Sequence, residues 1–137
     1  MGRILAIDYG KKRTGLAVSD PLKMIATGLT TVASHALIPF LKDYTRKEPV
    51  EKIIIGLPLD LQGRDTDATP LVREMIRILH KHFPDIPVEA VDERFTSQLA
   101  SRTLVESGLK KKARQNKALV DEVSATILLQ GYLQSVL

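Results

Sequence analysis

Three carboxylates occupy positions where an acid is costly unless something binds it. Asp8 follows the apolar run 4–7, and Glu93 ends a second strand-like segment, 88–94. Asp121 lies on an otherwise apolar face of a C-terminal helix. A carboxylate buried without a partner costs several kcal/mol, so each of these acids predicts a binding partner.

A divalent metal ion is the partner that this set of residue types favours. The chain has no cysteine and only three histidines, so oxygen atoms must supply most of the ligands. Carboxylate oxygens suit Mg²⁺ or Mn²⁺. Two such ions about 4 Å apart stabilise the attacking and leaving oxygens in phosphodiester hydrolysis. The three acids together therefore predict a two-metal site.

Each acid also has a simpler interpretation. Asp8 could cap the turn that begins at Gly10, because aspartate side chains bond to nearby backbone in turns. Asp121 could be present because the positive end of a helix dipole favours an acid. No single carboxylate decides between these roles, whereas convergence of all three would.

The elements that must position these acids alternate between strands and helices. Segments 3–10, 14–20 and 24–32 predict a three-stranded meander, with a short turn between the first two strands. Ser34 is expected to cap a helix over 35–47. The later elements are a buried strand over 50–57, a loop over 58–65, a helix from Thr69 with Leu71, Val72, Met75, Ile76 and Leu79 buried, a strand over 88–94, a helix from Thr96 or Ser97 to Ser107, and a final helix over about 118–135.

This order of elements would bring the acids to one edge of a sheet. The helix between strands 50–57 and 88–94 implies a right-handed crossover and parallel pairing. Asp8 and Glu93 then end strands that can be neighbours, at the carboxyl edge where open α/β sheets bind ligands. Helical spacing aligns the members of the last helix's apolar face, which are Asp121, Ala125, Leu128, Tyr132 and Val136.

Composition limits the class of protein. A chain of 137 residues with 44% hydrophobic residues predicts a single folded domain over 1–137. No stretch is long and apolar enough for a membrane span, and Met1 leads directly into a strand rather than a signal peptide. We therefore expect a cytoplasmic protein with no membrane partner and no small-molecule cofactor. A net charge of +4 leans toward an anionic partner.

Basic residues near the predicted site are candidates for nucleic-acid phosphates. Five positive charges fall within 110–117, and a solvated charge run is the competing interpretation there. Arg94 could instead be a structural counter-ion of Asp92. The residues expected to hold phosphates are Arg13, Arg94, Lys110, Lys111, Lys112, Arg114 and Lys117.

Four segments, taken together, resemble the YqgF family, also called RuvX or Holliday junction resolvases. They are 7–10, 56–59, 92–97 and 116–117 with Asp121. The resemblance spans the chain and implies an α/β, RNase H-like (RuvC-like) fold, with a five-stranded mixed sheet in the order 3-2-1-4-5 flanked by helices. It also implies a metal-dependent nuclease that matures the 5′ end of 16S ribosomal RNA precursors, with ribosomal precursor particles as partners.

On the family pattern the catalytic, metal-binding acids map to Asp8, Glu93 and Asp121. The chain departs from the wider superfamily on the fourth strand, where Gly56 and Leu57 stand in place of an acid. Glu93 would have to take over that role. Asp92 is the alternative, since a shift of one residue in register would exchange the two side chains.

Three other functions compete with RNA processing. The nearest is cleavage of four-way DNA junctions, because phosphate contacts do not distinguish the two substrates. A nucleic-acid-binding module without catalysis would keep the fold but not depend on the acids. Half of an actin-like ATPase is the third, because such kinases also open with Asp-x-Gly, although they need two domains around the nucleotide.

Overall fold

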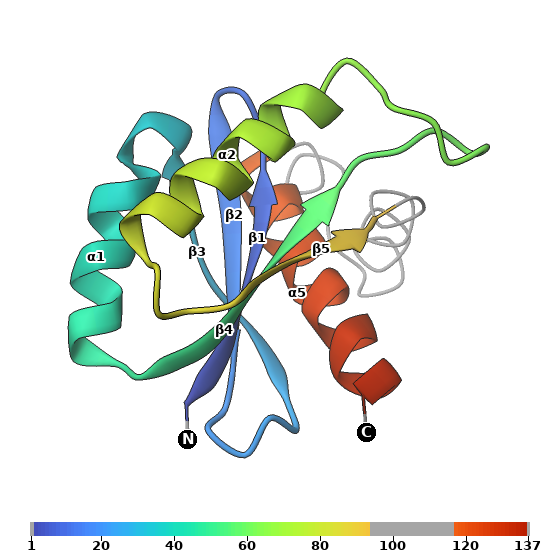
Figure 1. Cartoon of the computed structure of the whole chain (residues 1–137). Helices are drawn as coiled ribbons and strands as arrows, with labels where there is room; N and C mark the ends of the chain where they lie inside the picture. The colour runs from blue at the N-terminus through green and yellow to red at the C-terminus, as the bar shows by residue number, and fades with distance from the viewer. Residues whose placement is uncertain (1, 94–116, 137) are drawn as a thin grey trace.

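The computed structural model describes residues 2–93 and 117–136. Its five strands form one sheet in the order β3-β2-β1-β4-β5, which confirms the predicted topology (Figure 1). The strands are β1 (Arg3–Tyr9), β2 (Arg13–Ser19), β3 (Ala26–Ala33), β4 (Val50–Leu57) and β5 (Val88–Asp92).

The sheet is mixed, and its register places the candidate acid of β1 beside β2 and β4. β1 is antiparallel to β2, with Asp8 opposite Gly15. β4 is parallel to β1, and β5 is parallel to β4, with Gly56 opposite Val91. The carboxyl ends of β1, β4 and β5 therefore meet at one edge. The prediction that the strands of Asp8 and Glu93 could be neighbours is wrong, because β4 lies between them.

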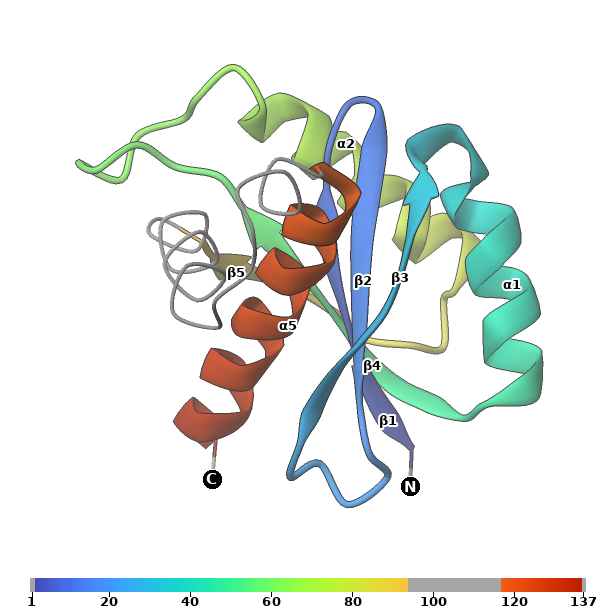
Figure 2. The same ribbon diagram turned by 180° about the vertical axis from the view of Figure 1, so that it is seen from behind.

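Helices cover both faces of the sheet (Figures 1 and 2). The 3-10 helix η1 (Ser34–Ala36), α1 (Leu37–Lys47) and α2 (Thr69–His82) lie on one face, and α5 (Lys117–Val136) lies on the other. The side chains of β1 alternate between the two faces: Leu5 and Ile7 pack in the core with α1 and α2, while Ile4 and Ala6 pack against α5. Asp8 continues the second row and so faces α5.

Several predicted details of the helices are wrong. Ser34 does not cap α1, whose N-cap is Ala36 without a side-chain bond. The Ser34 hydroxyl instead donates to the carbonyl of Gly10 at 2.5 Å. Leu71 is 44% exposed, because the buried line of α2 runs through Val72, Met75 and Leu79.

The last helix and two strand boundaries also differ from prediction. Val136 is 57% exposed, since the C-terminal turn of α5 leads away from the sheet (Figure 1). β3 begins at Ala26 rather than Met24, because the Asp20 carboxylate accepts the backbone N–H groups of Met24 and Ile25 at 2.8 Å and holds them in the turn. β5 ends at Asp92, so Glu93 lies one residue beyond the strand.

Some predictions fall outside the described residues. These are the helix from Thr96 or Ser97 to Ser107, Arg94, and the basic side chains of 110–117. In the described part of the chain, every helix is too short or too polar to span a membrane.

Candidate active site

Asp8 and Glu93 are in contact at the carboxyl edge of the sheet. Asp8 is partly buried near the end of β1, and its side chain is hydrogen-bonded to that of Glu93. The backbone N–H of Glu93 donates to the carbonyl of Leu57 at 3.3 Å, which keeps residue 93 beside β4. Asp92 is exposed, so Glu93 is the acid that reaches Asp8.

The two carboxyl groups strongly perturb one another. Burial, the Asp8 charge and the Asp8 hydrogen bond raise the pKa of Glu93 from 4.5 to about 8. Burial and the Asp121 charge raise the pKa of Asp8 from 3.8 to about 6, although the hydrogen bond with Glu93 opposes this rise. At neutral pH a protonated Glu93 therefore donates to an ionised Asp8. Two carboxyl groups that share a proton in this way could serve as ligands of a divalent cation, which would stabilise the pair in place of the proton.

Asp121 lies close to this pair but has another partner. Its Oδ2 accepts a hydrogen bond from Nε of Arg13 at 2.9 Å, and this ion pair is partly exposed. Its charge nevertheless acts on Asp8. Helix α5 can come this near because Gly15, opposite Asp8, has no side chain: a Cβ there would overlap the Asp121 carbonyl and lie 2.9 Å from the Glu122 nitrogen.

The structure thus brings two predicted acids together and holds the third alongside in an ion pair. Among residues 2–93 and 117–136, no group of three or more His, Asp or Glu side chains is close enough to hold a metal ion. The donor chemistry of Asp8 and Glu93 fits a divalent cation. Asp121 would have to exchange its bond with Arg13 to complete the ligand set.

The turn that carries Arg13 is anchored at its base. Besides the bond to Gly10, the Ser34 hydroxyl lies 2.8 Å from Thr14 Oγ1, and the Ser34 N–H donates to the carbonyl of Lys12 at 2.9 Å. Lys11 and Lys12 are exposed on this turn. Of the three consecutive cations at 11–13, Arg13 meets the acids through Asp121. Ser34 anchors this turn, a role that local sequence patterns do not reveal.

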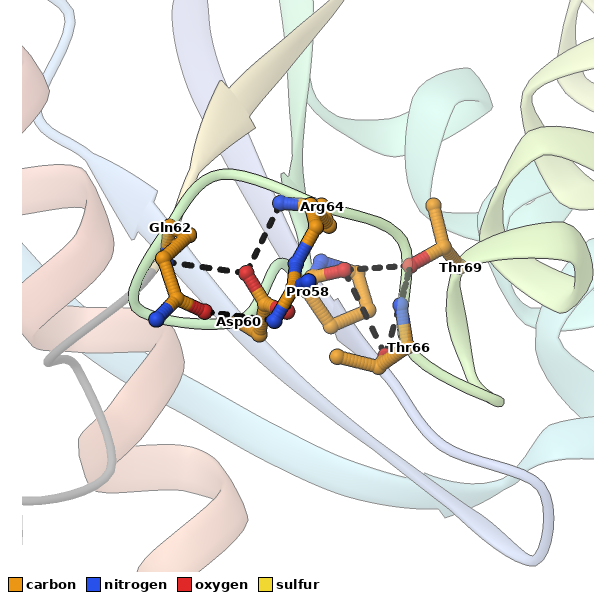
Figure 3. Close-up of polar contacts among 6 residues, drawn as sticks. All are labelled: Pro58, Asp60, Gln62, Arg64, Thr66 and Thr69. Carbon is orange, nitrogen blue, oxygen red and sulfur yellow. Dashed lines mark hydrogen bonds and ion pairs between the residues drawn. The ribbon is translucent and has the colours of Figure 1, made fainter.

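The loop after β4 leaves the same edge of the sheet in a fixed conformation (Figure 3). Asp60 Oδ1 accepts the backbone N–H groups of Gln62 at 2.9 Å and Arg64 at 2.8 Å, and Asp60 Oδ2 accepts from Arg64 Nε at 2.9 Å. Leu61 is 69% exposed at the tip, and Gly63 adopts a φ of 81°, which favours glycine.

The far end of this loop is tied to the start of α2. The buried Thr69 hydroxyl donates to the carbonyl of Pro58 at 2.5 Å and accepts from the Thr66 N–H at 2.8 Å (Figure 3). Arg73 forms a two-fold ion pair with Asp65. These hydrogen bonds and ion pairs therefore hold the loop in one conformation where it leaves the carboxyl end of β4.

A shallow groove of about 700 Å³ lies elsewhere, between β5 and α5, and Val91, Leu128 and Tyr132 are among its lining residues. Asp8 and Glu93 do not line it.

The overall fold matches that of a solved structure. It superposes on a solved structure of T. thermophilus RuvC in complex with Holliday junction substrate, with a TM-score of 0.58 over 99% of this chain and 96% of that chain. The two sequences are 14% identical, so this likeness shows the RNase H-like fold.

The family follows from the sequence comparison. A family model described as RuvX: Holliday junction resolvase matches residues 2–135, and the chain belongs to this family. A relative from Bacteroides thetaiotaomicron is 61% identical over 98% of both chains, and one from Flavobacterium psychrophilum is 56% identical over 97% of both. Both relatives carry the name "Putative pre-16S rRNA nuclease".

Proposed function

We propose that this chain is a divalent-metal-dependent nuclease that hydrolyses phosphodiester bonds in structured RNA, and that it matures the 5′ end of 16S ribosomal RNA precursors in the cytoplasm. The observation that carries the proposal is the Asp8–Glu93 carboxyl pair at the carboxyl edge of the sheet. The choice of precursor 16S rRNA as the substrate rests on the names of the two relatives.

In this proposal Asp8, Glu93 and Asp121 hold Mg²⁺ or Mn²⁺, with two ions in the complete site. A divalent cation supplies Lewis acidity and neutralises the charge that develops on the phosphate during hydrolysis. Asp8 contributes the central carboxylate because it lies between the other two acids. Glu93 gives up its proton to the solvent when a cation replaces that proton.

Arg13 is proposed to bind a substrate phosphate. Its Nε donates one hydrogen bond to Asp121 Oδ2 at 2.9 Å. A guanidinium group also binds phosphate, with two parallel hydrogen bonds. The exposed Lys11 and Lys12 extend the same positive border. Arg94, Lys110, Lys111, Lys112, Arg114 and Lys117 remain proposed phosphate contacts, outside the described side chains.

The test is cleavage of precursor 16S rRNA by purified protein with Mg²⁺ or Mn²⁺, beside the Asp8→Asn and Asp121→Asn variants. We expect products with a shortened 5′ leader from the wild type alone. Cleavage that survives both substitutions unchanged would remove the mechanism. Binding that weakens with salt but never leads to cleavage would instead support a module without catalysis.

Cleavage of four-way DNA junctions is the second candidate, favoured by the family's description and by the fold shared with RuvC. The same assay with a labelled junction distinguishes the two. Faster cleavage of the junction than of precursor rRNA, at equal salt and metal, would make DNA the substrate. Ribosomal precursor particles are the proposed partners, and co-sedimentation of the protein with them would test this association.

A further inference from the structure

Glu93 reaches Asp8 by crossing the strand that separates them. β5 and β1 lie on opposite sides of β4, so a side chain that leaves the end of β5 must pass over β4 to meet the end of β1. The residue at the crossing point is Gly56, which is buried and lies one position beyond the Ile7–Ile55 pair of β1 and β4.

Gly56 leaves the space that the Glu93 carboxylate occupies. A Cβ built on Gly56 would overlap Glu93 Oε2 and lie 2.8 Å from Glu93 Cδ, too close for any real pair of carbons. The third neighbour is Leu128 Cδ2 of α5 at 3.3 Å, which is tight but tolerable with a small shift. A methyl group at position 56 would therefore clash with Glu93, whereas Leu128 could move aside.

Glycine is not required at this position by backbone conformation. Gly56 is paired within a regular parallel ladder, and the only described glycine with a positive φ is Gly63. In the interior of a strand, glycine weakens the structure relative to alanine. A destabilising residue in a buried strand often marks a close approach by another group, and here that group is the Glu93 carboxylate.

We propose that Gly56 is a positioning residue for the metal-binding acids: the absence of a side chain on β4 seats the Glu93 carboxylate against Asp8. This inference rests on the proposed function and adds a determinant to its site. The far end of a glutamate is flexible, so a methyl group at position 56 would displace the carboxylate and leave the protein folded.

The experiment compares Gly56→Ala with Gly131→Ala, a matched control because a Cβ at Gly131 meets nothing within 4 Å. The first readout is the rise in the thermal unfolding midpoint caused by Mn²⁺. We expect a clear rise for the wild type and for Gly131→Ala, and a much smaller one for Gly56→Ala. The second readout is precursor-rRNA cleavage, expected to fall about 100-fold in Gly56→Ala, as displacement of a reacting group by about 1 Å can do.

A second background separates positioning from general packing. Glu93→Asp withdraws the carboxylate by one methylene, so adding Gly56→Ala to it should change the Mn²⁺ response and the residual cleavage less than about threefold. An equal loss in both backgrounds would assign the effect to Leu128 and overturn the inference. If Gly56→Ala alone does not fold, restored folding in a Glu93→Ala background supports the inference, and continued failure to fold overturns it.

The outcomes also distinguish this inference from the proposed function. A wild type that cleaves no nucleic acid but responds to Mn²⁺, beside an unresponsive Gly56→Ala, would refute the nuclease and retain Gly56 as the positioning residue. A wild type that cleaves, beside a Gly56→Ala variant with the same rate and the same Mn²⁺ response, would retain the nuclease and refute the inference.

Discussion

Replacing Asp8 with asparagine is expected to stabilise the metal-free protein while it abolishes cleavage. Folding raises the pKa of the Asp8 carboxyl from 3.8 to about 6, mainly through burial and the Asp121 charge. The folded state therefore binds this proton more tightly than the unfolded state does. The contribution to stability is fully present below pH 4 and is lost as the pH rises through about 6.

The size of the effect follows from the pKa shift. A shift of about 2 units at about 1.4 kcal/mol per unit amounts to about 3 kcal/mol at pH 8. Asparagine is close in shape to aspartate, carries no charge, and its amide can hydrogen-bond to Glu93 either as donor or as acceptor. We expect the free energy of unfolding of Asp8→Asn to exceed that of the wild type by up to about 3 kcal/mol at pH 8. The difference should nearly vanish at pH 4.

Guanidinium unfolding in EDTA at pH 4 and pH 8 measures this difference, and the expected rise in the midpoint of thermal unfolding is about 10 °C at pH 8. Asp85→Asn makes the same chemical change at an exposed position between α2 and β5 and should leave stability unchanged at both pH values. With Mg²⁺ present, cleavage by Asp8→Asn should fall at least about 100-fold, since a ligand to the cation is lost. A variant less stable than the wild type at pH 8, or a stability difference independent of pH, would refute the account of Asp8 as a carboxyl group whose pKa is raised on folding.

Three further predictions concern the rest of the site. The apparent affinity for Mn²⁺ should rise from pH 6 to pH 8, with proton release on binding, because Glu93 holds its proton up to about pH 8. Calorimetry in two buffers of different ionisation enthalpy measures the affinity and the number of protons released, and a pH-independent affinity would exclude Glu93 as a ligand. Arg13→Ala should change the free energy of unfolding by less than about 1 kcal/mol, because the ion pair with Asp121 is partly exposed. The same variant should bind RNA more weakly and with a smaller salt dependence, whereas Arg46→Ala, an exposed change on α1, is the control. Asp60→Ala removes the acceptor of two backbone N–H groups in the loop after β4 and should raise KM for RNA with little change in Tm; an unchanged KM would show that this loop does not contact the substrate.

The sheet order came from the resemblance, and the elements came from local patterns. The run at 53–55 predicts a buried strand, and Pro70 at the start of an apolar stripe predicts a helix, because both depend on side chains only a few positions apart. Ser34 failed as a cap because a distant turn, at Gly10 and Thr14, competes for its hydroxyl. Such competition between distant partners is not visible in a local sequence pattern.

The candidate acids could be selected by residue type, but their partners could not. Helical spacing places Asp121 on an apolar helix face, but its partner Arg13 is 108 positions away in the sequence. The sequence pattern predicts Glu93 on a strand beside that of Asp8, whereas Glu93 reaches Asp8 over an intervening strand. The available signal was glycine within strands, at Gly15 and Gly56, which is a mark of close approach.

These two glycines explain how a sheet edge can hold three acids without an acid on its fourth strand. Gly15 and Gly56 lie on either side of Asp8, on β2 and β4, and both lack the side chain that would cover it. The backbone of α5 packs closely against Gly15, which brings Asp121 near Asp8, and the Glu93 side chain packs against Gly56 from the end of β5. A larger residue at either position would separate one acid from Asp8 by about the width of a methyl group. The spacing of the acids therefore depends on positions that carry no functional group.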